Sequence, residues 1–167
     1  MKKRRGAAGG LDEGLIQTMR ASRLVDVNAK DEDGGTGLHL AVREGKPDIV
    51  RLLLGSARID INARNAHGRT PVHLAVIDYA YESVFDLIGC NRMDINAEDK
   101  EGWTALRWAA RHGREILVKE VLTALAIAVN AADAQGWAAL RHGAEGRHSK
   151  VGRMLLSDPC IRIRAGR

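Results

Sequence analysis

Apolar and polar positions recur along the chain at a fixed spacing of 34 residues. The recurring positions are Asn28, Asn62, Asn96 and Asn130, then Gly34, Gly68, Gly102 and Gly136, and then Leu38, Val72, Leu106 and Leu140. A fixed period between about 20 and 50 residues is typical of proteins that stack one structural unit many times. Because three sets of positions keep the same phase, the sequence predicts a repeat protein.

Within one repeat the pattern predicts a turn followed by two short helices. Residues 31–35 form the turn, in which we expect Gly34 to adopt a positive φ. Thr36 is placed to cap the first helix, and Gly45 to end it in the left-handed conformation. The second helix starts near Pro47. Its apolar face is made by Ile49, Val50, Leu53 and Leu54.

Two segments carry a resemblance to a known family. Residues 70–75, Thr-Pro-Val-His-Leu-Ala, resemble the Thr-Pro-Leu-His signature of ankyrin repeats, and residues 49–54 resemble their second helix. The resemblance extends from about Gly14 to the C-terminus. It implies an all-α solenoid of stacked helix pairs joined by β-hairpin-like turns.

The resemblance also implies roles for recurring polar residues. His39 and His73 are expected to hydrogen-bond to the threonine three residues earlier and to tie the loop to the helix. The four recurring asparagines are expected to hydrogen-bond to the backbone of neighbouring hairpins.

The phase divides the chain into a basic tail, a half repeat, three clear repeats and a degenerate repeat. These are residues 1–13, 14–30, 31–64, 65–98, 99–132 and 133–167. The half repeat lacks its first helix, and we therefore expect the chain to be a piece of a longer array.

Two departures from the pattern are visible. Tyr79 stands in phase with Gly45 and Gly113, and because a bulky residue is costly in the left-handed conformation, we expect this loop to follow another path. In the last repeat Ala138 replaces the capping threonine, and several glycines fall in or at the ends of the helices. These changes predict weaker helices there.

Composition limits the class of protein. The chain is 45% hydrophobic but has no apolar run long enough to span a membrane. Cys90 and Cys160 stand at unrelated positions of the repeat, so they predict no disulfide framework and favour an intracellular, cytoplasmic location. Residues 2–5, Lys-Lys-Arg-Arg, leave nuclear import open.

The net charge of +5 arises at the two ends of the chain. Nucleic-acid binding would favour basic groups along one continuous face. A nucleic-acid-associated role for the basic termini therefore stays an alternative, and not the main interpretation.

Catalytic, cofactor and metal chemistry find no support in the motifs. There is no Gly-x-Ser-x-Gly elbow and no phosphate-binding glycine loop. His142, His148 and Cys160 lack a zinc spacing. We predict neither an enzyme nor a bound cofactor.

The main interpretation is a protein-binding module or adaptor. The alternative is a regulatory or substrate-recruiting fragment of a larger protein. By the resemblance, hairpin tips and first helices line a concave face that binds a protein partner. The candidate contact residues on this face are Asp33, Arg43, His67, Arg69, Ile77, Asp78, Trp103, Arg111, His112 and Trp137.

Among these candidates, Trp103 and Trp137 occupy matching positions of adjacent repeats. The earlier repeats have Gly35 and Arg69 there, so the fold does not require an aromatic residue. We expect the two indoles to lie side by side as one aromatic surface. Trp108 matches Leu40 and Leu74 and is expected in the core.

Overall fold

The computed structural model describes residues 26–124, 126–133 and 135–161. Within these ranges the chain forms eight α-helices in four pairs, with one isolated β-bridge between Lys30 and Thr36. The first helices of the pairs are α2 (Gly37–Arg43), α4 (Pro71–Ile77), α6 (Ala105–Arg111) and α8 (Ala139–Glu145). The second helices are α3 (Pro47–Leu54), α5 (Tyr81–Ile88), α7 (Glu115–Thr123) and α9 (Ser149–Leu156). The predicted all-α solenoid is confirmed.

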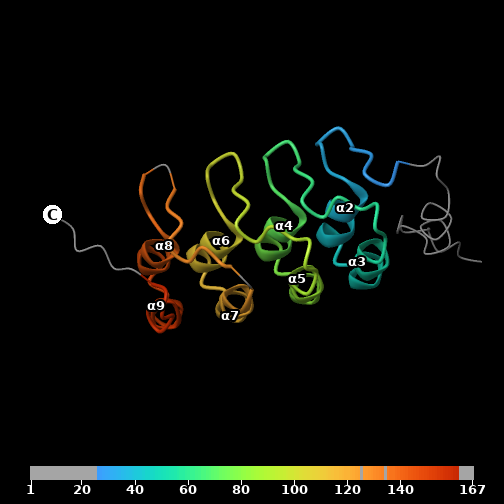
Figure 1. Cartoon of the computed structure of the whole chain (residues 1–167). Helices are drawn as coiled ribbons and strands as arrows, with labels where there is room; N and C mark the ends of the chain where they lie inside the picture. The colour runs from blue at the N-terminus through green and yellow to red at the C-terminus, as the bar shows by residue number, and fades with distance from the viewer. Residues whose placement is uncertain (1–25, 125, 134, 162–167) are drawn as a thin grey trace, which may run out of the picture.

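Figure 1 shows the helices in two rows, with hairpin-like loops that project from one of them. The first helices form the row beside the loops, and the second helices form the row beneath. Each helix contacts its own pair partner and the helix of the same row in the next pair. The predicted tail and the half-repeat helix, residues 1–13 and 14–23, lie outside the described residues.

Each of these helices is too short to be stable alone, and packing between pairs stabilises it. They contain seven to nine residues, whereas an isolated helix below about 12 residues is marginal in water. The predicted apolar face of α3 is confirmed: Ile49, Val50 and Leu53 are buried, and Leu54 is partly buried against the core.

The turn glycines have the backbone conformation that the sequence predicts. The φ values of Gly34, Gly68, Gly102 and Gly136 lie between 70° and 77°. Gly68 has a second reason to lack a side chain, since a Cβ atom would lie 2.9 Å from the backbone nitrogen of Lys100 in the next hairpin. The glycine therefore also permits close stacking of hairpins.

The expectation for Tyr79 is wrong. Its φ is 65°, close to the 61° of Gly45 and the 65° of Gly113, so the loop follows the same path. This conformation costs about 1–2 kcal/mol for a residue with a side chain. The phenol ring offsets part of that cost, because it packs edge-on against Tyr81 at 4.5 Å and lies 3.6 Å from the guanidinium carbon of Arg114.

The signature histidines join each repeat to the next. As predicted, Nδ1 of His39 lies 3.0 Å from the Thr36 hydroxyl, and it also accepts the backbone N–H of Thr36. Nε2 donates to the carbonyl oxygen of Arg69 in the following hairpin at 3.0 Å. His73 repeats this arrangement with Thr70 and with the carbonyl of Trp103. Each imidazole must therefore be neutral to keep all of its bonds.

The recurring asparagines form a second set of ties, which confirms the prediction. Nδ2 of Asn62 donates to the carbonyl of Arg92 at 2.9 Å, and its Oδ1 accepts the N–H of Asp94 at 2.8 Å. Asn28 and Asn96 bridge to the following loop in the same way. One side chain thus satisfies two backbone groups of the neighbouring repeat.

In the fourth pair α8 and α9 form despite the unfavourable residues. Ala138 occupies the N-cap of α8 and offers no side-chain bond, and Gly143 and Gly152 lie inside the two helices. Gly143 has a use in packing, since a Cβ atom there would lie 3.2 Å from Val151 of the partner helix.

The stability of the array should fall in mild acid. Burial lowers the pKa of His39 and of His73 below the ordinary 6.5, although bonds to backbone carbonyls oppose this shift. Below about pH 6.5 the unfolded chain binds protons that the folded chain excludes, so stability decreases as the pH falls. The slope is at most about 1.4 kcal/mol per pH unit for each histidine.

Urea unfolding at pH 7.5 and pH 5.5 measures this effect. The double variant His39→Gln/His73→Gln should show a shallower dependence between the two values. An equal free energy of unfolding at both pH values for the wild-type chain would contradict the assignment of neutral, buried imidazoles.

Candidate binding surface

The candidate residues lie along the hairpin tips and the adjoining side of the first helices, which we call the hairpin–helix surface. The structure exposes most of them, namely Asp33, Arg43, His67, Asp78, Arg111 and His112. The others are only partly buried, namely Arg69, Ile77, Trp103 and Trp137. A partner could therefore reach all ten positions, but the two groups differ in their contacts.

An aromatic cluster forms where the last two described hairpins meet α6 and α8. The ring of Trp103 lies 4.8 Å from Trp108 and 4.4 Å from His142, measured between centroids. Trp137 lies 5.8 Å from the same imidazole. The two indoles are therefore joined through His142 and do not form the direct pair that the sequence predicts.

The reason for this difference is the position of His142. It is in phase with Trp108, so it projects from α8 as Trp108 projects from α6, and its ring enters the space between the two indoles. Trp108 packs against the core as predicted, but like Leu40 and Leu74 it is only partly buried. Its outer side belongs to the cluster.

Backbone bonds fix both indoles at the ends of their turns. The N–H of Trp103 donates to Oδ1 of Asp99 at 2.9 Å, and its carbonyl accepts from His73 of the preceding repeat. The N–H of Trp137 donates to Oδ1 of Asp133 at 2.8 Å. Arg141 covers Trp137, with its guanidinium carbon 3.6 Å from the ring.

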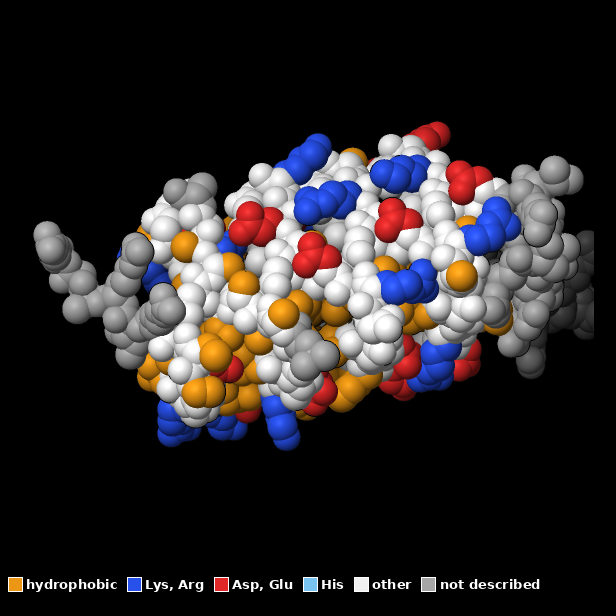
Figure 2. Space-filling view, viewed as in Figure 1, with side chains coloured by type: hydrophobic (Ala, Val, Ile, Leu, Met, Phe, Trp, Pro, Cys, Tyr) orange, Lys and Arg blue, Asp and Glu red, His pale blue; other side chains and the backbone are white. Residues whose placement is uncertain are grey.

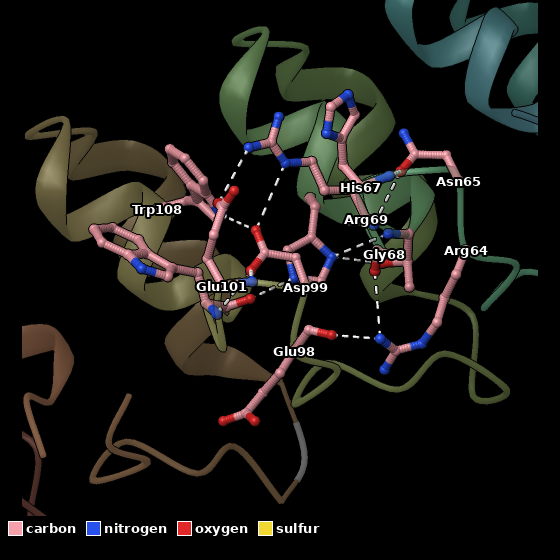
Figure 3. A network of polar contacts seen from close by, with 12 residues as sticks. Arg64, Asn65, His67, Gly68, Arg69, Glu98, Asp99, Glu101 and Trp108 are labelled. Carbon is pink, nitrogen blue, oxygen red and sulfur yellow. Dashed lines mark hydrogen bonds and ion pairs between the residues drawn. The ribbon is translucent and has the colours of Figure 1, made fainter. Parts of the chain in front are cut away.

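Asp99 is the centre of the polar network beneath these rings (Figure 3). It is 6% exposed. Besides its bond to the backbone N–H of Trp103 in the turn, the carboxylate accepts the indole N–H of Trp108 at 3.0 Å. It also lies 3.6 Å from Nε of Arg69. One carboxylate thus joins a hairpin, a first helix and the preceding repeat.

Arg69 belongs to this network as a support for the cluster. Its guanidinium also lies 3.5 Å from Glu101 and 4.8 Å from the centroid of Trp108. The side chain is 21% exposed. It therefore holds two repeats together and offers only its edge to a partner.

In the last repeat a buried hydrogen bond between His142 and Asp133 replaces the Asp99–Trp108 bond. Nε2 of His142 lies 2.8 Å from Oδ2 of Asp133, and both residues are buried. Burial acts to raise the pKa of Asp133. The N–H groups of Trp137 and Gln135 and the imidazole of His142 outweigh burial and lower it. The carboxylate stays charged and holds the imidazole beneath the indoles.

Arg107 takes the position of the signature histidine in the third repeat. Its side chain is 1% exposed and donates to the carbonyl of Gly102 and, at 3.2 Å, to the carbonyl of Ala131. Burial lowers its pKa, and the ion pair with Glu98 at 3.6 Å opposes that shift. The guanidinium of Arg107 thus donates to the segment that leads into the next hairpin, whereas the imidazole of the first two repeats bonds to the next hairpin itself.

Burial changes the pKa of two titratable groups on the hairpin–helix surface. Burial raises the pKa of Asp78, although Arg43 and Arg69 oppose the shift. Burial, together with the nearby Arg114 and Arg111, lowers the pKa of His112. At neutral pH His112 is therefore uncharged, and Arg111 supplies the positive charge.

The sequence did not reveal several of the residues that build this surface. Asp99, Asp133 and Arg107 were not singled out, and His142 was considered only as a metal ligand. A signal was present for two of them: Asp99 and Asp133 are in phase with Asp31 of the first turn. Among the described residues, no group of three or more His, Cys, Asp and Glu side chains could hold a metal ion.

The stacked helix pairs, with one hairpin per pair and polar ties between pairs, define a repeat solenoid. Over the described residues no helix is long and apolar enough to cross a membrane. The family model described as ankyrin repeats (3 copies) matches residues 7–99 and 75–165, which together span most of the chain. The chain belongs to the ankyrin repeat family, whose members are in general protein–protein interaction modules. The comparison with curated proteins found no match.

Replacing Asp99 tests the network beneath the cluster. Asp99→Ala removes the acceptor for the backbone N–H groups of Glu101 and Trp103 and for the indole N–H of Trp108. It should lower the free energy of unfolding by about 2–4 kcal/mol. Asp99→Asn should cost less, because Asn65 occupies the equivalent position and accepts the N–H groups of His67 and Arg69. Urea unfolding measures both, and an Ala variant within about 0.5 kcal/mol of wild type would refute the central role.

Proposed function

We propose that the chain is a non-enzymatic binding module that holds a protein partner on its hairpin–helix surface. The aromatic cluster is the observation that carries the proposal. Trp103 and Trp137 are large apolar side chains that stay partly exposed, whereas each repeat buries other apolar residues. Aromatic residues of this kind are enriched among the contacts that dominate binding energy.

The repeat itself does not require these rings. The equivalent positions are Gly35 and Arg69, and the first two hairpins fold with the same turn bonds. The cluster is also preorganised, since Asp99 and Asp133 fix the backbones of Trp103 and Trp137. A partner that binds there does not need to order the rings, and this reduces the entropy cost of association.

The charge beside the cluster defines the partner's chemistry. Arg111 is half exposed, with its nearest carboxylate on Glu145 at 4.0 Å, and Arg141 lies exposed over Trp137. One guanidinium group over an indole, and a second at the end of α6, favour an apolar residue flanked by an acidic one. We infer that the partner presents such a pair.

Two other functions remain as alternatives. A recruiting fragment of a larger protein would use the same surface. A nucleic-acid-associated role would depend on the basic termini, of which residues 2–5 lie outside the described residues. The free Cys90 and Cys160 favour an intracellular location for any of these roles.

The double variant Trp103→Ala/Trp137→Ala tests the proposal. It should abolish affinity capture of the partner from the native cell, because truncating a binding hot spot costs about 2 kcal/mol or more. Thermal unfolding of the same variant should change little.

Phe85→Ala is the matched control, since Phe85 is an aromatic residue of α5 that is 49% exposed and lies away from the cluster. Capture should persist in this variant. A collapse of thermal stability in the double variant would show that the indoles are structural, and full capture by a folded double variant would place the anchor elsewhere.

A further inference from the structure

The turns between first and second helices form a row of their own. Gly45, Tyr79, Gly113 and Arg147 stand at the same position of the four turns, with φ between 59° and 65°. In each turn the next residue donates its N–H back to the first helix, as Ala80 does to Ala75 at 2.9 Å. The backbone is thus the same in all four turns, and only the side chains differ.

A residue from the following repeat covers the second and the third turn. The guanidinium of Arg114 lies over the ring of Tyr79, and the imidazole of His148 lies so close to Gly113 that a Cβ atom there would be 2.3 Å from Nδ1. The residue in phase with Arg114 and His148 in the second repeat is Ala80. A methyl group cannot cover Gly45, around which a Cβ atom would meet nothing within 4 Å.

An open pocket of about 250 Å³ results between the first two turns. Its walls are the ring of Pro47, the methyl of Ala80 and the rings of Tyr79 and Tyr81. Drug-sized ligands occupy pockets of about 300–1,000 Å³. The pocket therefore fits one large side chain better than a whole small molecule.

Tyr79 supports a functional role for the pocket. It keeps a 38% exposed ring in a conformation that glycine adopts at two of the other three turns. Strained residues of this kind cluster at functional sites. Here the ring forms one wall of the pocket.

One edge of the pocket, at Glu82, is acidic, whereas the guanidinium of Arg114 lies against the wall made by Tyr79. Glu82 shares the guanidinium of Arg51 with Asp48 and Asp86, at distances of 3.0 Å, so three carboxylates face one positive charge. Figure 2 shows blue and red side chains gathered at the lower edge of the molecule, in the part where Figure 1 places α3 and α5. The carboxylates of Asp48 and Glu82 are largely exposed, and the group keeps a net negative charge. A basic residue on a partner would complement it.

We propose that this pocket is a second docking site, which takes a large apolar side chain of a protein partner with a lysine or arginine beside it. It lies on the turn row and not on the hairpin–helix surface, and it does not depend on the function proposed for that surface. The partner's apolar side chain completes the turn row at the one place where the chain supplies only a methyl group.

The capped peptide acetyl-Lys-Phe-Lys-amide is a suitable probe, followed by amide chemical shifts of the full chain. The amides of Gly45, Ala80 and Ser83 should shift in a saturable manner at roughly millimolar peptide, as expected for one anchoring side chain. Acetyl-Glu-Phe-Glu-amide should bind at least several-fold more weakly because of the carboxylates at the Glu82 edge. Equal binding of the two peptides would overturn the predicted partner chemistry.

Filling the pocket tests its position. Ala80→Arg introduces the residue that the third repeat has at this site, and it should abolish the shifts. Ala80→His, which introduces the residue of the fourth repeat, is the second variant if the first does not fold. Ala80→Ser keeps the side chain small and should retain binding, as should Arg147→Gly, which changes a turn without such a pocket. Shifts that persist in a folded Ala80→Arg or Ala80→His chain would refute the proposal.

Failure here is separable from failure of the proposed function. The Trp103→Ala/Trp137→Ala chain should bind the Lys-Phe-Lys peptide like wild type. Loss of binding in that variant would place the peptide on the aromatic cluster and would contradict a separate site on the turn row.

Discussion

The side-chain hydrogen bonds that cross from each repeat to the next are the constraint on which the rest of the structure depends. Each loop carries backbone groups that its own short helices cannot satisfy, and leaving such groups buried without partners is costly. His39 and His73 satisfy a carbonyl of the following hairpin, and Asn28, Asn62 and Asn96 each satisfy a donor and an acceptor of the following loop. Each bond spans 30 or 32 residues, and the residues that form it recur at the 34-residue period of the sequence.

Once these ties are in place, the remaining positions are free to differ between repeats. The third repeat replaces the histidine with the buried Arg107, and the fourth replaces a carboxylate–indole bond with the Asp133–His142 hydrogen bond. The residues that differ are also those that give each surface its character. The aromatic cluster lies towards the C-terminal end of the array, and the pocket beside Ala80 lies between the first two turns. A regular scaffold thus carries two irregular surfaces.

The fold was predictable from the sequence because its determinants are periodic, but the details of the surfaces were not. Period and phase predicted the helices and the turn glycines, and the resemblance to ankyrin repeats implied the histidine bonds and the asparagine ties. Tyr79 was misjudged because local backbone preference was weighed without Arg114, which lies 35 residues further along the chain and packs on the ring. The indoles of Trp103 and Trp137 were expected to touch because the separation set by His142 depends on how side chains fill the space between α6 and α8. Such packing is not encoded in spacing alone.

Hydrogen exchange of an Asn62→Ala chain tests most directly whether neighbouring repeats are joined by these local ties. Asn62 bonds to the loop that contains Arg92 and Asp94. In a stack held by nearest-neighbour contacts, the loss of these bonds should accelerate exchange of the amides in that loop and in the two adjoining pairs. Amides of α8 and α9 should keep their wild-type protection. Uniform loss of protection along the chain, or no change at Asp94, would contradict the account.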